Sequence, residues 1–283
     1  MAAFDPRLTP ARPDLAAASL RGKIEAARYA EARPYQILRG RAGLRVKPDH
    51  NACMDNEMLF GEGFTVYEIA NGWAWGQSAQ DGYVGYLRDV AVGEGAPRPD
   101  HRVTALMTPL LPAPDIRRAY LDMLPMNAKV KVIETKGDFA SVAPDSYVFA
   151  RHLAPLDEHA ADWVAVAERF LGVPYVWGGK TAAGLDCSGL VQTALEAGGV
   201  RAPRDADLQQ KALGRALPLT ADYSGLQRGD LVFWADHVGI MIDGANLLHA
   251  SAFHMQVAVE PLAAVAARNA AAGRPVIGIK RLQ

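Results

Sequence analysis

The sequence has few of the features that mark disulfide-rich, metal-binding or membrane proteins. Only two cysteines, Cys53 and Cys187, occur among 283 residues, which is too few for a disulfide framework. No run of 18 or more apolar residues occurs, so no segment has the length of a membrane-spanning helix. The seven histidines show no spacing typical of metal ligands, and we expect neither a metal nor another cofactor.

A surplus of charge of one sign is also missing. Lys and Arg number 30 and Asp and Glu number 31, so there is no basic surplus for nucleic acid or for a membrane surface. The first 15 residues lack a cationic start followed by an apolar segment, so no secretory signal peptide is visible and a cytoplasmic location is expected. Half of the residues are hydrophobic, and the length predicts two or three domains with ordinary cores. Nothing in the pattern indicates an oligomeric state.

The most informative stretch runs from Pro174 to Gly199. It begins as a glycine-rich loop, and from Cys187 onward the apolar residues at positions 190, 191, 194 and 195 form one helical face. Cys187 is therefore predicted at a helix N-terminus, where the helix dipole favours the thiolate, the nucleophilic form of cysteine. A lone cysteine is more often a buried structural residue, but the glycines around this one indicate an open approach.

Two histidines follow on a predicted β-hairpin. His237 begins a strand with alternating apolar residues, and His249 lies on the return strand. Asp243 and Gly244 between them are typical turn residues. A single strand histidine is more often structural, yet two of them after a cysteine at a helix start favour a Cys-His-His catalytic arrangement.

The two imidazoles can meet only if the hairpin loop has an odd number of residues. Side chains alternate between the two faces along a strand, and directly opposed residues of an antiparallel pair share a face. The residue numbers of all opposed pairs in one hairpin have the same sum. His237 and His249 therefore share a face only if this sum is even, as 237 + 249 is. A three-residue loop, residues 243–245, satisfies this condition and puts His249 opposite Gly239. We expect Gly244 or its neighbour at positive φ, and we expect Gly239 to leave room for the two rings.

Four segments resemble, in order and spacing, the NlpC-type bacterial cell-wall cysteine peptidases, which are papain-like enzymes with a circularly rearranged topology. The segments are GLDCSGLVQTAL, RGDLVFW, HVGIM and LLHAS, and the resemblance covers residues 157–283. It implies that Cys187 is the nucleophile, that His237 is its base, and that His249 orients this base.

The same resemblance implies several substrate-binding residues in this region. Tyr175 corresponds to a tyrosine that lines the site, and Asp186, Ser188 and Asp205 correspond to residues that contact the bound peptide. From the residues alone, Tyr175 is equally a packing residue, and Asp186 and Ser188 are ordinary helix caps. Relatives carry Ser where this chain has Ala206, so one substrate hydrogen bond is expected to be missing.

The chain before residue 157 reads as β-structure after an initial arm. Short segments rich in Val, Tyr and Trp, separated by Gly, Asn and Asp, predict one small barrel over residues 34–96 and another over 97–156. The two sets align as an internal repeat, in which Gly72 matches Gly137. Both resemble bacterial SH3-like barrels. The predicted fold class is α+β: two small SH3-like β-barrels followed by a papain-like α+β cysteine peptidase domain.

Residues 1–33 are predicted to form a helical arm. Asp14 can cap a helix, and Leu15, Leu20, Ile24 and Tyr29 can form its apolar face. No chemistry is expected from this arm.

In one subgroup of the resembled family, the first barrel closes the cleft and holds the free amino group of a murein peptide's L-alanine. The residues that correspond are Glu62 in LFGE and Tyr83 in DGYVG, with Tyr86 as the alternative to Tyr83. A carboxylate and a phenol suit an ammonium group. Composition alone favours a solvated turn residue for Glu62 and a packing aromatic for Tyr83.

The resemblance therefore predicts a cysteine endopeptidase that hydrolyses the γ-D-glutamyl–diamino acid bond, with meso-diaminopimelate as the diamino acid, in murein peptides with a free N-terminal L-Ala. A role in cell-wall recycling follows, with the murein peptide as partner and with neither nucleic acid nor membrane. One alternative is a thiol amidase or acyltransferase on another substrate, which Glu62 and Tyr83 argue against. Another is an inactive wall-binding module, which the intact Cys187, His237 and His249 argue against.

Overall fold

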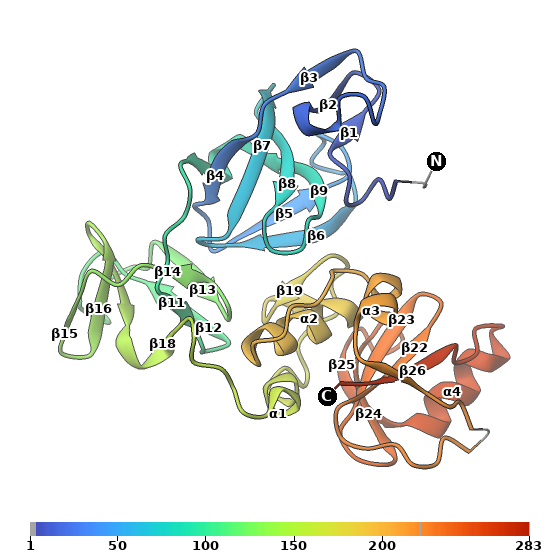
Figure 1. Cartoon of the computed structure of the whole chain (residues 1–283). Coiled ribbons are helices and arrows are strands. Elements are labelled where there is room, and N and C mark those ends of the chain that lie inside the picture. The colour runs from blue at the N-terminus through green and yellow to red at the C-terminus, as the bar shows by residue number, and fades with distance from the viewer. Residues whose placement is uncertain (1–3, 221, 283) are drawn as a thin grey trace. The chain divides into compact units, whose positions relative to one another are not determined.

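The structure is a computed structural model that describes residues 4–220 and 222–282. The chain divides into two compact units, with unit 1 ending at Leu156 and unit 2 beginning at Asp157 (Figure 1). Unit 1 consists of strands and short turns, and unit 2 combines four helices with a six-stranded sheet, as far as the described residues extend. The fold class is α+β.

The arm at the start of unit 1 is not helical, so the prediction of a helix there is wrong. Its elements are β1 (Ala11–Arg12), β2 (Leu15–Ala17), a 3-10 turn η1 (Ala18–Leu20) and β3 (Arg28–Ala30). The three consecutive residues of β2 are all buried, whereas an amphipathic surface helix buries only one side. Asp14 does not cap a helix, because its carboxylate accepts hydrogen bonds from the Arg12 guanidinium.

The first barrel of unit 1 is a seven-stranded sheet in the order β10-β4-β7-β8-β9-β5-β6. Figure 1 shows these strands curling around a common interior. The interior is filled by apolar side chains from all parts of the sheet, including Ile37, Leu44, Met58, Phe64 and Leu87. The strands are β4 (Arg33–Ile37), β5 (Arg41–Arg45), β6 (Met54–Leu59), β7 (Gly63–Ala70), β8 (Trp73–Ser78), β9 (Val84–Arg88) and β10 (Val92–Glu94).

The remaining strands of unit 1 repeat this pairing pattern. The strands are β11 (His101–Val103), β12 (Met107–Leu110), β13 (Asp122–Pro125), β14 (Lys129–Val130), β15 (Glu134–Lys136), β16 (Phe139–Ala143), β17 (Ser146–Phe149) and β18 (Leu153–Pro155). Strand β11 pairs with β14 and β18 as β4 pairs with β7 and β10, and β15-β16-β17 corresponds to β7-β8-β9. Gly72 and Gly137 occupy equivalent turns with φ of 78° and 60°. The pairing supports the predicted internal repeat, and the boundary at residues 96–97 stays a prediction.

Unit 2 is built on a sheet in the order β21-β26-β22-β23-β24-β25. The strands are β21 (Arg215–Leu217), β22 (Asp230–Trp234), β23 (His237–Met241), β24 (Asn246–Ser251), β25 (Gln256–Pro261) and β26 (Gly278–Arg281). Its helices are α1 (Trp163–Glu168), α2 (Cys187–Ala197), α3 (Ala206–Ala212) and α4 (Leu262–Ala271), and a small hairpin, β19 (Lys180–Thr181) and β20 (Gly184–Leu185), precedes α2. Helix α1 ends at Glu168, so Leu171 lies beyond its end and is exposed.

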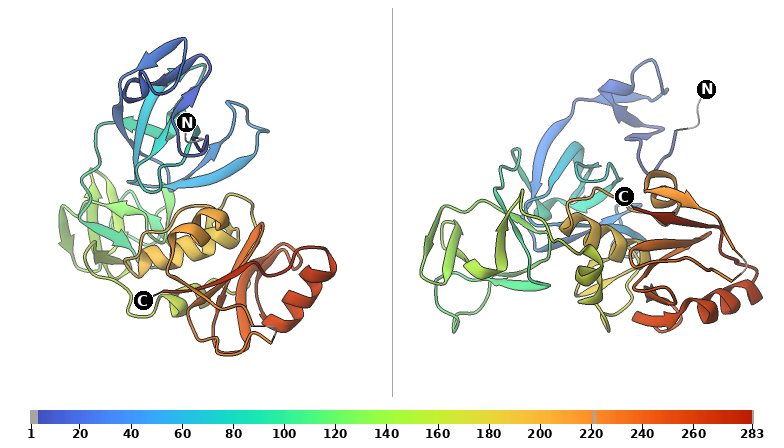
Figure 2. Two further views of the ribbon diagram at one scale, coloured as in Figure 1. Left: turned by 45° about the vertical axis from the view of Figure 1, so that its right-hand side comes forward. Right: turned by 60° about the horizontal axis from the view of Figure 1, so that its bottom comes forward.

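Helices pack on this sheet at the two histidine strands. Helix α2 packs against β23 and β24. Helix α4 contributes Leu262, Val265 and Ala266 to a core with Trp234 and Leu247 of the sheet. Both views of Figure 2 show α4, the red helix, beside the sheet of unit 2. The sheet thus brings the start of α2 and the side chains of α4 to the same pair of strands.

The hairpin of β23 and β24 has the predicted register. Ile240 opposes Leu248 and Met241 opposes Leu247, so every opposed pair has the same even sum and the loop has three residues. His237 and His249 therefore share one face of the sheet. The expectation of positive φ in the loop is wrong, because no residue from 243 to 245 takes such a conformation. The Asp243 carboxylate closes the loop instead, accepting from the amides of Ala245 (2.8 Å) and Asn246 (2.7 Å).

Candidate active site

Cys187 is the first residue of α2. Asp186 caps the helix in an extended conformation, and its side chain accepts from the amide of Gly189 at 2.8 Å. The amides of Val238 and Ser188 donate to the Cys187 sulphur, which places the thiol at the start of β23, next to His237. The amide of Cys187 itself lies in the first turn of α2, where helix geometry offers no partner to its N–H.

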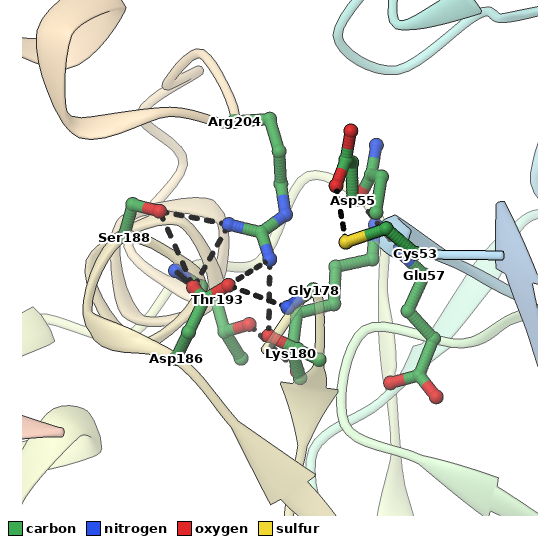
Figure 3. Close-up of polar contacts among 12 residues, drawn as sticks. Cys53, Asp55, Glu57, Gly178, Lys180, Asp186, Ser188, Thr193 and Arg204 are labelled. Atoms are coloured by element: carbon green, nitrogen blue, oxygen red, sulfur yellow. Dashed lines mark hydrogen bonds and ion pairs between the residues drawn. The ribbon is translucent and has the colours of Figure 1, made fainter. Parts of the chain in front are cut away.

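The start of α2 is fixed by a buried ion pair. Arg204 donates to both carboxylate oxygens of Asp186, at 2.9 and 2.6 Å, and to the Ser188 hydroxyl at 2.8 Å, as Figure 3 shows. The Arg204 side chain is 1% exposed and that of Asp186 is 8% exposed. Asp186 also accepts from the amide of Gly178 at 2.8 Å. The observed contacts of Asp186 and Ser188 are thus structural, and their role in substrate binding stays a prediction.

The glycines around Cys187 serve close packing and not an open approach. A Cβ atom on Gly189 would lie 2.2 Å from the carbonyl oxygen of Gly179, and one on Gly179 would lie 2.4 Å from that of Gly184. Backbone therefore packs directly on backbone where the loop meets α2. Cys187 is buried as a result, with 7% of its surface exposed.

The two histidines are in direct contact. His237 Nε2 lies 2.7 Å from His249 Nδ1, and the rings meet edge to face with centroids 5.0 Å apart. This contact uses the Nε2 edge of His237 and so leaves its Nδ1 edge for another partner. Gly239 is required here for a reason other than the predicted one, because a Cβ atom on it would lie 2.8 Å from the side chain of Leu247.

Burial keeps the thiol and the imidazoles uncharged in this site. It raises the pKa of Cys187 to about 12, with a smaller contribution from the nearby Asp186 carboxylate. Burial, followed by the neighbouring His249, lowers the pKa of His237 to about 3. Burial also lowers the pKa of His249. A neutral imidazole beside a neutral thiol can act as a general base that removes the thiol proton.

Tyr175 and Asp205 occupy the surroundings of this site. Tyr175 is half-buried, and its amide donates to Met255 in the loop between β24 and β25 at 2.9 Å. Burial raises the pKa of its phenol, followed by the effect of a charge on Cys187, which places the ring near the sulphur. Asp205 stands at the N-cap position of α3 without a capping hydrogen bond from its side chain. The substrate roles of both residues stay predictions.

The residues predicted to hold the substrate amine lie within the first barrel. Glu62 is 1% exposed, lies in the turn between β6 and β7, and accepts from the amide of Leu59 at 2.9 Å. Tyr83 is 4% exposed and belongs to the barrel core. Tyr86 accepts a hydrogen bond from Arg12 at 3.0 Å in an open pocket of about 410 Å³ that Trp73 and Trp75 also line. Their role in amine recognition stays a prediction.

Two charged residues at the site were not assigned a role from the sequence. One is Arg204, whose guanidinium forms the buried ion pair with Asp186. The other is Glu260 on β25, whose Oε1 lies 3.0 Å from His249 Nε2. No sequence motif indicates a role for Glu260. The one available sign is that a carboxylate occurs in an otherwise apolar strand segment, VAVEP.

Comparison with known families finds a match in each of the two units. Residues 172–271 match the NlpC/P60 family, and residues 44–92 match the bacterial dipeptidyl-peptidase SH3 domain. Unit 2, which holds Cys187 and the paired histidines, therefore contains an NlpC/P60 domain. Unit 1 contains a bacterial SH3 domain.

Curated relatives match parts of this chain. A γ-D-glutamyl-L-lysine dipeptidyl-peptidase of Bacillus subtilis is 33% identical over 148 residues, covering 48% of this chain and 47% of the relative. A dipeptidyl-peptidase 6 of Lysinibacillus sphaericus is 26% identical over 247 residues, covering 78% of this chain and 89% of the relative. The chain spans less than half the length of two γ-D-glutamyl-L-lysine dipeptidyl-peptidases that it matches, at 47% for that of Bacillus subtilis and 41% for that of Bacillus cereus.

The fold has a solved counterpart. The crystal structure of an NlpC/P60 family protein from Bacillus cereus superposes with a TM-score of 0.73 at 19% identity, covering 88% of this chain and 99% of the other. At this identity the likeness concerns the fold alone. Among the residues that the structure describes, no helix combines the length and the apolar character needed to cross a membrane.

Proposed function

We propose that this protein is a cysteine endopeptidase that hydrolyses the γ-D-glutamyl–diamino acid bond of murein peptides with a free N-terminal L-Ala. The observation that carries the proposal is the pairing of His237 with His249 at 2.7 Å, next to a thiol whose sulphur accepts the amide of Val238. A nucleophile, a base and a group that orients the base are the three parts that acyl transfer by a thiol needs.

In the proposed mechanism, His237 removes the proton of Cys187 as the sulphur attacks the γ-carbonyl carbon of D-glutamate. The amide of Cys187 and the hydroxyl of Tyr175 are the candidate donors to the oxyanion that forms. The diamino acid leaves after His237 returns the proton to its nitrogen, and water then hydrolyses the thioester. His249 holds the His237 ring throughout, and Asp186, Ser188 and Asp205 contact the D-glutamyl part.

The requirement for a free amine is supported by the names of the relatives. A dipeptidyl-peptidase releases two residues from a free N-terminus, and this word describes the matched SH3 domain and the curated relatives alike. Glu62 and Tyr83 are the residues we propose for this recognition. Peptides with a free L-Ala amine are fragments already released from the wall glycan, so we place the enzyme in cell-wall recycling in the cytoplasm. Cell fractionation that finds the protein outside the cytoplasm would contradict this location.

The test is hydrolysis of synthetic L-Ala-γ-D-Glu-meso-diaminopimelate by the full chain, with products identified by mass spectrometry. We expect L-Ala-γ-D-Glu and free diaminopimelate, and we expect Cys187→Ala to lower kcat by at least about 10⁴-fold without a change in circular dichroism. Cys53→Ala removes the other cysteine and serves as the matched control. The L-lysine peptide, tested in parallel, decides which diamino acid is preferred. A Cys187→Ala variant with normal turnover would overturn the proposal.

Acetylation of the peptide amine tests the second half of the proposal. It removes a positive charge that a buried carboxylate is proposed to bind, at a cost of about 3 kcal/mol, or more than about 100-fold in kcat/KM. Equal cleavage of the free and acetylated peptides would exclude recognition of the amine.

A further inference from the structure

A carboxylate–guanidinium pair lies behind the two histidines. Glu260 Oε1 is 3.0 Å from His249 Nε2, and Arg268 grips the same carboxylate with Nη1 at 2.7 Å from Oε2 and Nη2 at 2.8 Å from Oε1. The His249 side chain is 2% exposed and that of Glu260 is 14% exposed. A bidentate pair of this kind fixes both the position and the charge of the carboxylate.

The fold brings this pair to His249 through strand register and helix position. His249 opposes Ala258 in the β24–β25 ladder, so Glu260 lies two residues further along on the same face. Helix α4 begins at Leu262, directly after β25, and Arg268 reaches back from its second turn. The Arg268 guanidinium also lies 4.4 Å above the ring of Phe253, which limits its alternative positions.

We propose that Glu260, held by Arg268, is a positioning residue that sets the tautomers of both histidines and so directs a basic nitrogen at Cys187. An ionised carboxylate accepts only, so His249 must carry its proton on Nε2 and present an unprotonated Nδ1. His237 must then donate from Nε2 to His249 Nδ1. Its own Nδ1 is left unprotonated and able to take the thiol proton.

The charges around these hydrogen bonds agree with a chain in which His237 donates to His249 and His249 donates to Glu260. Hydrogen bonding to Arg268, and then to His249 and His254, lowers the pKa of Glu260 to about 2, so it is ionised wherever a peptidase of this kind works. His254, in the loop between β24 and β25, lies with its Nε2 3.2 Å from the same Oε1 of Glu260. The other charges on this side are Arg274 and its partner Asp236, which are 3.3 Å apart and exposed. When His237 becomes protonated during the reaction, the Glu260 carboxylate stabilises that charge through His249.

The inference rests on the proposed peptidase function, but its first test does not need a substrate. The full chain, labelled with ¹⁵N-histidine, shows by NMR which ring nitrogen of each histidine carries the proton. We expect His237 and His249 both to be protonated at Nε2. In Glu260→Ala, His249 Nε2 faces the Arg268 guanidinium, which is a donor, so Nε2 is expected to lose its proton and accept. His249 then carries its proton on Nδ1 and donates to His237 Nε2, and both rings change to the Nδ1-protonated tautomer.

Kinetics on the same variants separates positioning from binding. We expect Glu260→Ala to lower kcat about 100-fold and Glu260→Gln, which keeps the shape and one acceptor oxygen, about 10-fold, with KM changed less than about twofold. Alkylation of Cys187 by iodoacetamide should slow in the same order. The matched control is Glu168→Ala, which breaks another bidentate pair of unit 2, with Arg228 at 2.8 Å, away from the histidines. It should leave tautomers and kcat unchanged.

Unchanged tautomers and unchanged kcat in Glu260→Ala would overturn the inference. So would a loss of kcat that Glu168→Ala reproduces, because that result would show a general effect on stability. If Glu260→Ala does not fold, Glu260→Gln carries the test. If the wild-type chain hydrolyses no murein peptide, the proposed function fails while the tautomers and the alkylation rates still decide the role of Glu260.

Discussion

Cys187, which is buried, and His237, which is half-buried, are both neutral in the resting site because desolvation disfavours their charged forms. The pKa of the thiol is raised to about 12 and that of the imidazole is lowered to about 3. A preformed thiolate–imidazolium pair is therefore not favoured, and the proton moves as the sulphur attacks. The amide donors to the sulphur from Val238 and Ser188 lower the thiol pKa and assist this step.

The lowered pKa of His237 predicts a loss of stability in acid. Its folded pKa is about 3 and its unfolded pKa is 6.5, so between these values the unfolded state binds more protons. Stability should fall as the pH falls from 6.5 toward 3, by up to about 1.4 kcal/mol per pH unit from this group. In His237→Leu this contribution disappears, and the free energy of unfolding should depend less steeply on pH. Urea unfolding at pH 4.5, 5.5 and 6.5 measures the slope.

The control for this measurement is His50→Leu, which removes an exposed histidine of unit 1. Parallel pH slopes for wild type and His237→Leu would mean that His237 is not buried in its neutral form.

At the residue scale, the sequence predicts the residues that lie in local patterns. Cys187 follows from a helix start, and His237 and His249 follow from a strand pattern. Glu260 could not be predicted, because it reaches His249 only through the pairing of β24 with β25. The function of the glycines near Cys187 was also misjudged, since close backbone packing and an open approach require the same small residues.

Among the elements, α2 depends most on a single buried contact. Asp186 caps the helix and accepts five hydrogen-bond donors, two of them from Arg204. Without Arg204 the buried Asp186 carboxylate would lose this ion pair. The position of Cys187 therefore depends on a residue 17 positions beyond it in sequence (204 − 187).

We predict that Arg204→Met destabilises unit 2 by about 3–5 kcal/mol, the usual cost of removing one partner of a buried ion pair. Arg215→Met, at an exposed arginine of the same unit, is the matched control and should change stability by less than about 0.5 kcal/mol. Chemical unfolding followed by circular dichroism measures both. A loss below about 1 kcal/mol for Arg204→Met would show that water or another donor replaces the guanidinium.

Elements with strict periodicity were the most predictable. The hairpin register follows from the two-residue period of a strand, which allows only an odd loop. The loop conformation did not follow, because the Asp243 side chain closes it through hydrogen bonds that make positive φ unnecessary. The prediction of a helix in the arm was wrong for a related reason. Leu15, Leu20 and Ile24 fit a helical spacing, but in the structure they lie in a buried strand and in turns.

At the scale of the whole molecule, the two barrels of unit 1 are joined to each other by direct contacts. The amide of Gly40 donates to Asp122 at 2.7 Å, and the amide of Lys129 donates to the carbonyl of Phe60 at 2.8 Å. A Cβ atom on Gly61 would lie 1.9 Å from the carbonyl oxygen of Lys129, so the barrels approach backbone to backbone. We therefore expect both barrels to unfold together.

Unit 2 has a core of its own, in which α4 packs on Trp234 and Leu247. Its proposed catalytic residues and the positioning residue Glu260 all lie within residues 157–283. We predict that this fragment folds cooperatively when expressed alone and keeps the tautomers of His237 and His249. Because the proposed receptor for the amine, Glu62 and Tyr83, lies in unit 1, the fragment should lose the discrimination between free and acetylated peptides.

The measurement is the ratio of kcat/KM for free and N-acetylated L-Ala-γ-D-Glu-meso-diaminopimelate. It should exceed about 100 for the full chain and fall to within about threefold of unity for residues 157–283. The full chain with Glu62→Gln is the matched variant, and it should lie between these limits, since an amide still accepts a hydrogen bond from an ammonium group but lacks its charge. A fragment that folds and keeps a ratio above about 100 would place the amine receptor in unit 2, and the first barrel would then have no part in the specificity.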